Sequence, residues 1–240
     1  MKSLGIFGDS FADDTYGEQG KSWIDTIRDA NEYKITNYSK AGSNMWYTYS
    51  QFIENHNKNE QNIVLITNPN RIIIPKDSPL KVSSYMSYLQ VLEQFDNHGN
   101  SVTQDYILLR DYYEKIHNSD QDESLHALMV KEIESLSPNT ILYYSIPPTE
   151  HIFSLFHITM FECRCLGIDI TTKDRWTYAS NMVKKIHSKG ARDQRKCHMT
   201  DDNNQVVGKM FLNRLRGKDV NLSFSDLIKP NKPLEYYFHV

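Results

Sequence analysis

The sequence predicts an α/β protein with three layers, in which helices cover both faces of a parallel sheet of flavodoxin-like character. Two observations carry this prediction. Short apolar runs recur along the chain and end in turn-forming residues, as buried parallel strands do. Between these runs, apolar residues recur at helical spacing, so strands and helices alternate. Right-handed crossovers then bring the carboxyl ends of the strands to one edge of the sheet, where ligand sites lie in such folds.

The predicted strands are four apolar runs. They lie at Leu4–Phe7, Tyr33–Tyr38, Ile63–Ile66 and Ile141–Ile146. Two prolines directly follow the fourth run and end it, because proline cannot donate a hydrogen bond to a strand ladder. The first three strands alternate with helices in the order βαβαβ, which is the arrangement of a parallel sheet.

Helices are predicted where apolar residues recur every three or four positions. The first helix follows Ser22, a suitable N-cap, and the last covers about Asp201–Leu215 after Thr200, another suitable N-cap. The stretch 151–167 fits a helix or a strand equally well. A helix between the second and third strands is indicated by the spacing of Trp46, Tyr49, Phe52 and Ile53.

A long stretch between the third and fourth strands, about residues 78–137, shows helical spacing and no strand signal. We therefore expect a helical insertion there. With this insertion, residues 1–216 are still within the size of one domain. Residues 217–240 form a C-terminal extension that ends in aromatic residues. We expect this extension to pack on the domain or to contact a second copy of the chain in a homo-oligomer.

The composition argues against several classes of protein. The chain has 27 Lys and Arg against 30 Asp and Glu, a formal net charge of -3, so nucleic acids and anionic membranes are not expected as partners. No apolar run approaches the roughly 18–20 residues that span a bilayer. The first residues lack the pattern of a secretory signal, and the 3 cysteines cannot all pair. A cytoplasmic location is therefore expected.

Four residues near the carboxyl edge of the predicted sheet could act on one ligand. Ser10 follows the first strand in a sharp turn that exposes its hydroxyl, as a nucleophile requires. Gly42 follows the second strand and has no Cβ, so its N–H can approach a ligand closely. Asn70 follows the third strand and offers an amide donor. His198, just before the last helix, supplies the base that a serine nucleophile needs.

These blocks, in this order, resemble those of the SGNH (GDSL) hydrolase family. The resemblance rests on Gly8-Asp9-Ser10, on Gly42 within the turn after the second strand, on His198-Met199-Thr200, and on Trp23 between the first two blocks. It implies the SGNH hydrolase fold over residues 1–216, with Ser10 as nucleophile and His198 as general base. It also implies an oxyanion hole built from the N–H groups of Ser10 and Gly42 and the side chain of Asn70. It implies no cofactor and no metal.

Two positions depart from the family pattern. The third block of the family ends in Gly-X-Asn-Asp, whereas this chain has Asn68-Pro69-Asn70-Arg71. Asn70 matches better, and Asn68 remains an alternative. The family has an aspartate three residues before the histidine, where this chain has Arg195. The nearest acid is Asp193, so either Asp193 completes a catalytic triad or a backbone carbonyl orients His198 in a dyad.

Two other groups of residues have simpler interpretations. Asp13 and Asp14 could form a carboxylate pair for acid–base chemistry, but neighbouring side chains usually point apart, so a solvated turn is expected. Cysteines and His198 supply ligand types for zinc, and a strand would place the first two cysteines on one face, yet no Cys-X-X-Cys knuckle is present. The candidate ligands would be Cys163, Cys165, Cys197 and His198, but no metal site is expected.

The sequence thus predicts a serine esterase or acyl hydrolase that cleaves a carboxylic ester through an acyl-enzyme intermediate. Its substrate is expected to be a small-molecule or glycan ester, with an O-acetyl group on a glycan as the first candidate. Trp46, Tyr47 and Tyr49 either line an acyl or sugar pocket or pack in the core. The alternative is a catalytically inactive protein that keeps the SGNH fold for binding or assembly.

Overall fold

The computed structural model describes residues 1–15, 22–69, 71–74, 85–87, 91–92, 94–95, 101–146, 153–165 and 198–229. Its centre is a four-stranded parallel sheet in the order β2-β1-β3-β6. The strands are β1 (Lys2–Phe7), β2 (Tyr33–Asn37), β3 (Gln61–Ile66) and β6 (Ile141–Tyr144). This is the flavodoxin-like order, so the α/β fold class expected from the sequence is confirmed.

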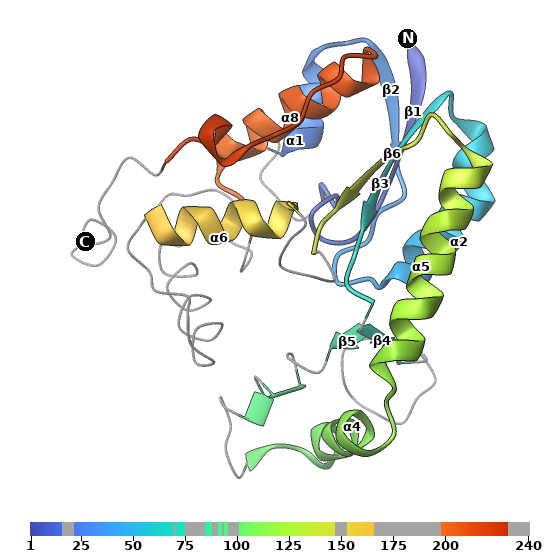
Figure 1. The fold of residues 1–240 in the computed structure, drawn as a ribbon, viewed down its shortest axis with the longest axis vertical. Coiled ribbons are helices and arrows are strands. Elements are labelled where there is room, and N and C mark those ends of the chain that lie inside the picture. Colours follow the sequence, from blue (N-terminus) through green and yellow to red (C-terminus); the bar gives the residue numbers. More distant parts are fainter. Residues whose placement is uncertain are drawn as a thin grey trace.

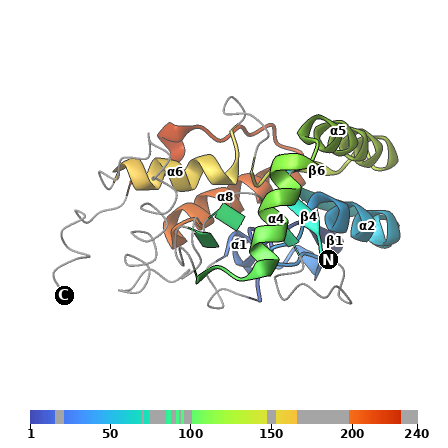
Figure 2. The same ribbon diagram turned by 90° about the horizontal axis from the view of Figure 1, so that it is seen from below.

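Helices cover both faces of the sheet and make three layers (Figures 1 and 2). On one face lie α1 (Trp23–Asp29) and α8 (Asp201–Leu215), and on the other lie α2 (Met45–Asn55) and α5 (Ser119–Leu136). Side chains along each strand alternate between two cores, because successive residues of a strand point to opposite faces of the sheet. Within β3, Ile63 and Leu65 pack toward α1 and α8, whereas Val64 and Ile66 pack toward α2 and α5.

The cores explain why these segments became helices. On the first face, Trp23 and Ile27 of α1 meet Phe211 of α8, and the Trp23 and Phe211 rings lie 4.7 Å apart. On the second face, Met45 and Phe52 of α2 meet residues of α5, among them Ile133. The helix starts agree with the predicted caps, since Ser22 forms a capping box with Asp25 and Thr200 accepts a hydrogen bond from Asn203 N–H.

The exposed side of α2 differs from the expectation. Phe52 is buried as predicted, but Trp46 is 54% exposed and Ile53 is 38% exposed. The residues that face the core are instead Met45, Thr48, Phe52 and Asn55. The apolar spacing therefore marked the helix correctly and its buried side in part, since Tyr49 packs against the core beside Phe52 while Trp46 and Ile53 are exposed.

The predicted helical insertion contains two different parts. Its second helix, α5, belongs to the central layers because it packs on the sheet beside α2. Its first part carries α4 (Gln104–Lys115) and the strand β5 (Tyr85–Ser87), which pairs antiparallel with β4 (Arg71–Ile73) just before the insertion. Neither short strand was expected. This part lies beyond the carboxyl edge of the sheet (Figure 1) and has a small core of its own, made by Ile74, Val91, Leu109 and Tyr113.

Two stretches left open by the sequence take definite forms. The stretch that fitted helix or strand contains the helix α6 (Leu155–Cys165), whose Leu155 and Ile158 join the core on the α1 and α8 side. The C-terminal extension, where it is described, passes through a short 3-10 turn at Phe224–Asp226 and buries Leu227. Residues 230–240, including the aromatic end, lie outside the described residues. No described helix is long and apolar enough to span a bilayer.

Gly208 sets how closely α8 packs on α1. A Cβ at this position would lie 2.5 Å from Thr26 Cβ and 2.7 Å from the backbone oxygen of Trp23. A backbone atom cannot move aside without shifting the helix, so even a methyl group would force the two helices apart.

We predict that Gly208→Ala lowers the free energy of unfolding by about 1–3 kcal/mol, because the overpacking outweighs the better helix propensity of alanine. Gln205→Ala, on the exposed side of the same helix, is the matched control and should change stability by less than about 0.5 kcal/mol. Urea unfolding followed by circular dichroism measures both. A stabilised Gly208→Ala variant would contradict the close approach.

Candidate active site

The turn after β1 presents Ser10 at the carboxyl edge of the sheet. The N–H groups of Ala12 and Asp13 both donate to Asp9 O, each at 3.0 Å, so the chain turns sharply as soon as the strand ends. Ser10 is half-buried, whereas Asp9 before it and Phe11 after it are buried. Since β1 is an inner strand of the sheet, Ser10 has the ends of β2 and β3 on either side.

The turn that contains Gly42 is tied to the Ser10 turn on both sides. Ser43 N–H donates to Lys40 O at 3.1 Å, and Gly42 at the third position has a φ of 75°, as a type II turn requires. Lys40 N–H donates to Gly8 O at 3.1 Å, and Ala41 N–H donates to an oxygen of Asp13 at 2.7 Å. The backbone around Gly42 is therefore fastened to residues just before and just after Ser10.

The buried carboxylate of Asp9 joins three strand ends. Its Oδ1 accepts the N–H of Phe11 at 3.0 Å, and its Oδ2 accepts the hydroxyl of Thr67 at 2.6 Å. The hydroxyl of Ser145 lies 2.9 Å from the same Oδ2. Thr67 follows β3 and Ser145 follows β6, so one fully buried side chain fixes the position of Ser10 relative to both.

Arg71 is the charged neighbour of this network. Its Nη1 donates to Ser43 O at 2.9 Å and lies 4.0 Å from Asp9 Oδ2, and its side chain is only 13% exposed. Its own carbonyl accepts a hydrogen bond from the Asn44 amide at 3.1 Å. Arg71 therefore connects the third strand end to the other two and partly neutralises a buried carboxylate.

A buried histidine connects α5 to the same edge. His126 Nε2 lies 2.9 Å from Thr67 O, and because a carbonyl oxygen can only accept, this nitrogen carries the proton. Burial lowers the pKa of His126, which favours the neutral ring. His126 thus extends the hydrogen-bond chain from Asp9 through Thr67 to the helical layer.

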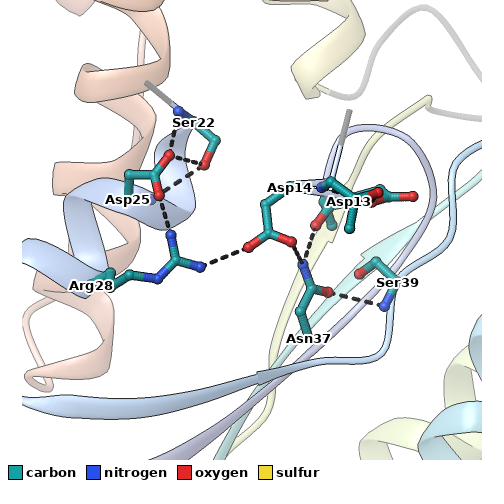
Figure 3. Close-up of polar contacts among 9 residues, drawn as sticks. Asp13, Asp14, Ser22, Asp25, Arg28, Asn37 and Ser39 are labelled. Atoms are coloured by element: carbon teal, nitrogen blue, oxygen red, sulfur yellow. Dashed lines mark hydrogen bonds and ion pairs between the residues drawn. The ribbon is translucent and has the colours of Figure 1, made fainter. Parts of the chain in front are cut away.

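The two aspartates after Ser10 have separate structural roles (Figure 3). Asp13 is 7% exposed and binds Ala41 N–H and the Thr15 hydroxyl. Asp14 instead accepts from Arg28 at 2.7 Å and from the Asn37 amide at 2.9 Å. The two side chains have different partners, so they do not act as a pair. The expectation of a solvated turn was wrong for Asp13, because the Gly42 turn covers it.

The ring of His198 stacks on Phe11, the residue directly after Ser10. The two ring centroids lie 4.5 Å apart with an angle of 24° between the planes, and His198 is only 8% exposed. Phe11 is itself held on the other side, since the Trp23 indole donates to Phe11 O at 2.7 Å. The stacking therefore places the imidazole against the residue that follows Ser10.

The segment that carries His198 is bound to α6. Glu162, a buried residue of α6, accepts hydrogen bonds from Thr200 N–H, the Thr200 hydroxyl and the Asn203 amide. Burial raises the pKa of Glu162 to about 7, although these three donors favour the ionised form and lower it.

The remaining predicted site residues are placed as follows. Asn68 is described and half-buried, directly after Thr67. Asn70 and Asp193 lie outside the described residues. Cys163 and Cys165 are on a helix rather than a strand, where a spacing of two puts them on different sides. Cys197 is outside the described residues, and within the described ones no cluster of three or more His, Cys, Asp or Glu could hold a metal ion.

No protein-family model and no curated protein sequence matches the chain. Among solved structures, it is similar to a lipase/acylhydrolase from Enterococcus faecalis, with 12% identity and a TM-score of 0.37 over 90% of this chain and 96% of the other. It is similar to the acetyl xylan esterase AlAXEase, with 9% identity and a TM-score of 0.35 over 89% and 99%. A member of the lipolytic G-D-S-L family from Veillonella parvula matches with 12% identity and a TM-score of 0.33 over 88% and 96%.

Several residues of the site were not predicted from the sequence. Asp9 and Thr67 lie in turns at strand ends, but only the pairing of the strands shows that the Thr67 hydroxyl donates to the Asp9 carboxylate. Ser145 has the same signal, a small polar residue at a strand end. Glu162 has none, because its partners lie 38 and 41 residues further along the chain.

We predict that Asp9→Asn destabilises the fold by about 1–3 kcal/mol, because the amide cannot accept from donors on both sides and leaves a buried hydroxyl or N–H unsatisfied. The exposed Asp29→Asn, which loses no buried hydrogen bond, is the control. Chemical unfolding followed by tryptophan fluorescence gives both values. Equal stabilities would contradict the role of Asp9 as the link between strand ends.

Proposed function

We propose that the chain is a serine ester hydrolase of the SGNH (GDSL) type. Ser10 Oγ attacks the carbonyl carbon of a carboxylic ester while His198 takes the hydroxyl proton. The tetrahedral intermediate collapses, and the alcohol leaves with the proton that His198 returns to it. Water, deprotonated by His198, then attacks the acyl-Ser10 ester and releases the acid. Bonds and protons balance in both halves, and the free enzyme is restored.

The observation that carries this proposal is the stacking of the His198 ring on Phe11. A serine hydroxyl is a weak nucleophile unless a base lies within reach, and such a base commonly comes from a distant part of the chain. Here the two groups are separated by most of the sequence, yet the ring rests 4.5 Å from the ring of the residue after Ser10. The stacking supports His198 as the base because it holds the ring at the turn that carries Ser10.

The turn of Gly42 supports an oxyanion hole beside Ser10. Gly42 has positive φ, and apart from its chain neighbours no described atom lies within 4 Å of the position that a Cβ would occupy, so a ligand could approach its backbone. The N–H groups of Ser10 and Gly42 would then share the negative charge of the intermediate, as preorganised donors do. Asn70 is proposed as the third donor, with Asn68 as the alternative. Asp193 is proposed to orient His198, with a backbone carbonyl as the alternative.

We predict that the wild-type chain hydrolyses p-nitrophenyl acetate and is labelled by a fluorophosphonate, and that Ser10→Ala abolishes the labelling. His198→Gln should lower kcat by about 10³-fold or more, because the nucleophile loses its base. Ser135→Ala, in the last turn of α5, and His56→Gln, before β3, are the matched controls, since both lie away from the carboxyl edge and should retain activity.

Labelling that persists in Ser10→Ala would place the nucleophile elsewhere. No labelling and no hydrolysis by the wild-type chain would favour the alternative function, a catalytically inactive protein that uses this edge for binding or assembly.

We propose further that the substrate is an acylated glycan, with O-acetyl as the acyl group. What supports this is the aromatic surface directly after the Gly42 turn. Trp46 is 54% exposed at the start of α2, and its ring lies 5.7 Å from that of Tyr49. Lys40 lies over the ring of Tyr47 at 5.7 Å. A flat aromatic face next to cationic and hydroxyl groups suits a sugar ring, which has an apolar face and a polar rim.

We predict that Trp46→Ala raises KM for an acetylated oligosaccharide about 5- to 10-fold, which corresponds to roughly 1 kcal/mol of binding, and leaves p-nitrophenyl acetate turnover unchanged. Acetate release measures the first reaction and nitrophenolate absorbance the second. Ile53→Ala, an exposed apolar residue at the other end of α2, is the control. Equal losses on both substrates would show that Trp46 acts through stability rather than through sugar binding.

A further inference from the structure

Glu162 is a buried carboxyl group that the proposed reaction does not use. It lies on α6, is 4% exposed, and faces the start of α8. Its Oε1 accepts from the Thr200 hydroxyl at 2.7 Å, from the Asn203 amide at 2.7 Å and from Thr200 N–H at 3.0 Å. Burying an ionisable group is costly unless it is well satisfied, so this arrangement calls for an explanation.

The donors all come from the segment that begins two residues after His198. Thr200 caps α8, and its neighbour Met199 is 2% exposed. The amide of Asn204 also holds Met199 O, at 3.1 Å. The backbone that follows His198 is therefore fixed to α6 by Glu162 and to α8 by its own helix start, and the ring at its beginning rests on Phe11.

The two oxygens of Glu162 are not equivalent. Among the described residues, Oε1 takes three short hydrogen bonds, whereas Oε2 receives only the shared Thr200 N–H at 3.2 Å. A proton on Oε2 would leave the three bonds to Oε1 in place. The charge on Asp202, at the start of α8, raises the pKa of Glu162 further, in the same direction as burial. What the segment needs from residue 162 is thus an oxygen acceptor at one point, rather than a negative charge.

We propose that Glu162 is a positioning residue for His198: its Oε1 docks the start of α8 onto α6 and so holds the imidazole beside the Ser10 turn. This inference rests on the proposed function, in which His198 is the general base. Loss of the acceptor would free Thr200 and Asn203 to seek other partners, and a shift of about 1 Å in a catalytic group can cost roughly 10²-fold in rate.

Three substitutions in the full chain separate the acceptor from the charge. Glu162→Gln keeps an oxygen at the Oε1 position and removes the charge. Glu162→Leu keeps the size and removes the acceptor, and Glu162→Asp keeps the charge but withdraws it by one carbon. Glu54→Leu, at an exposed glutamate of α2, is the matched control.

The position of His198 is read from the proton NMR signals of its ring, identified by their loss in His198→Gln. Stacking on Phe11 shifts these signals upfield, and Phe11→Leu gives their position without the stacking. We expect Glu162→Gln to keep the wild-type shift and a kcat/KM within about 3-fold. Glu162→Leu, or Glu162→Asp if the leucine variant does not fold, should move the signals toward the Phe11→Leu position and lower kcat/KM by about 10- to 100-fold.

Unchanged His198 signals in folded Glu162→Leu or Glu162→Asp would overturn the inference while leaving the esterase proposal intact. So would loss of the shift in folded Glu162→Gln, because an acceptor alone would then be insufficient. A wild-type chain that does not react with a fluorophosphonate would overturn the proposed function, and with it the catalytic purpose assigned to Glu162, whatever the NMR signals show.

Discussion

The described structure depends on the hydrogen bonds of the buried Asp9 carboxylate. In a parallel sheet the carboxyl ends of the strands share one edge, but the turns that follow them are independent loops unless something joins them. Asp9 joins the turn after β1 to the ends of β3 and β6, and Arg71 extends the link to the turn after β2. One side chain can accept hydrogen bonds from several donors because a carboxylate has about four acceptor positions. The proposed nucleophile is the next residue, so its place is set by the whole sheet.

The second requirement is that a residue near the other end of the chain returns to this turn. Two contacts with different physics accomplish it. The stacking of His198 on Phe11 is a packing contact, whereas the bonds from Thr200 and Asn203 to Glu162 are polar and buried. Packing alone leaves a ring free to slide over its partner, and hydrogen bonds fix the distance along the chain. Together they define both where the segment lies and how far it extends.

The elements of the fold were predictable because their signals are local. Ser22 and Thr200 cap the helices that follow them, and the apolar runs of β1 and β3 alternate between two cores. The pair β4 and β5 was missed since strands of three residues carry too little periodicity. The stretch around α6 was ambiguous because apolar residues occur on several of its sides. The burial of Asp13 was not predicted because it depends on the Gly42 turn, a segment remote in sequence that covers it.

The candidate site also contains residues that the sequence predicts and residues that it does not. Ser10, Gly42 and His198 could be proposed from their order and from the sheet topology, since strand ends are where such residues act. The partners that hold them could not, because Asp9 to Ser145 and Glu162 to Thr200 are pairs of residues remote in sequence. Hydrogen bonds of this kind leave no periodic trace, and each residue alone looks like an ordinary polar residue of a turn or helix.

The small core made by Ile74, Val91, Leu109 and Tyr113 has a consequence for motion. It is distinct from the two cores of the sheet, and it stabilises the part of the chain beyond the carboxyl edge. Units with separate cores can open separately, with a free energy smaller than that of global unfolding. The amides of α4 should therefore exchange their hydrogens earlier than those of β1 and β3. The part of the chain around the proposed substrate can then open locally while the strand that positions Ser10 stays folded.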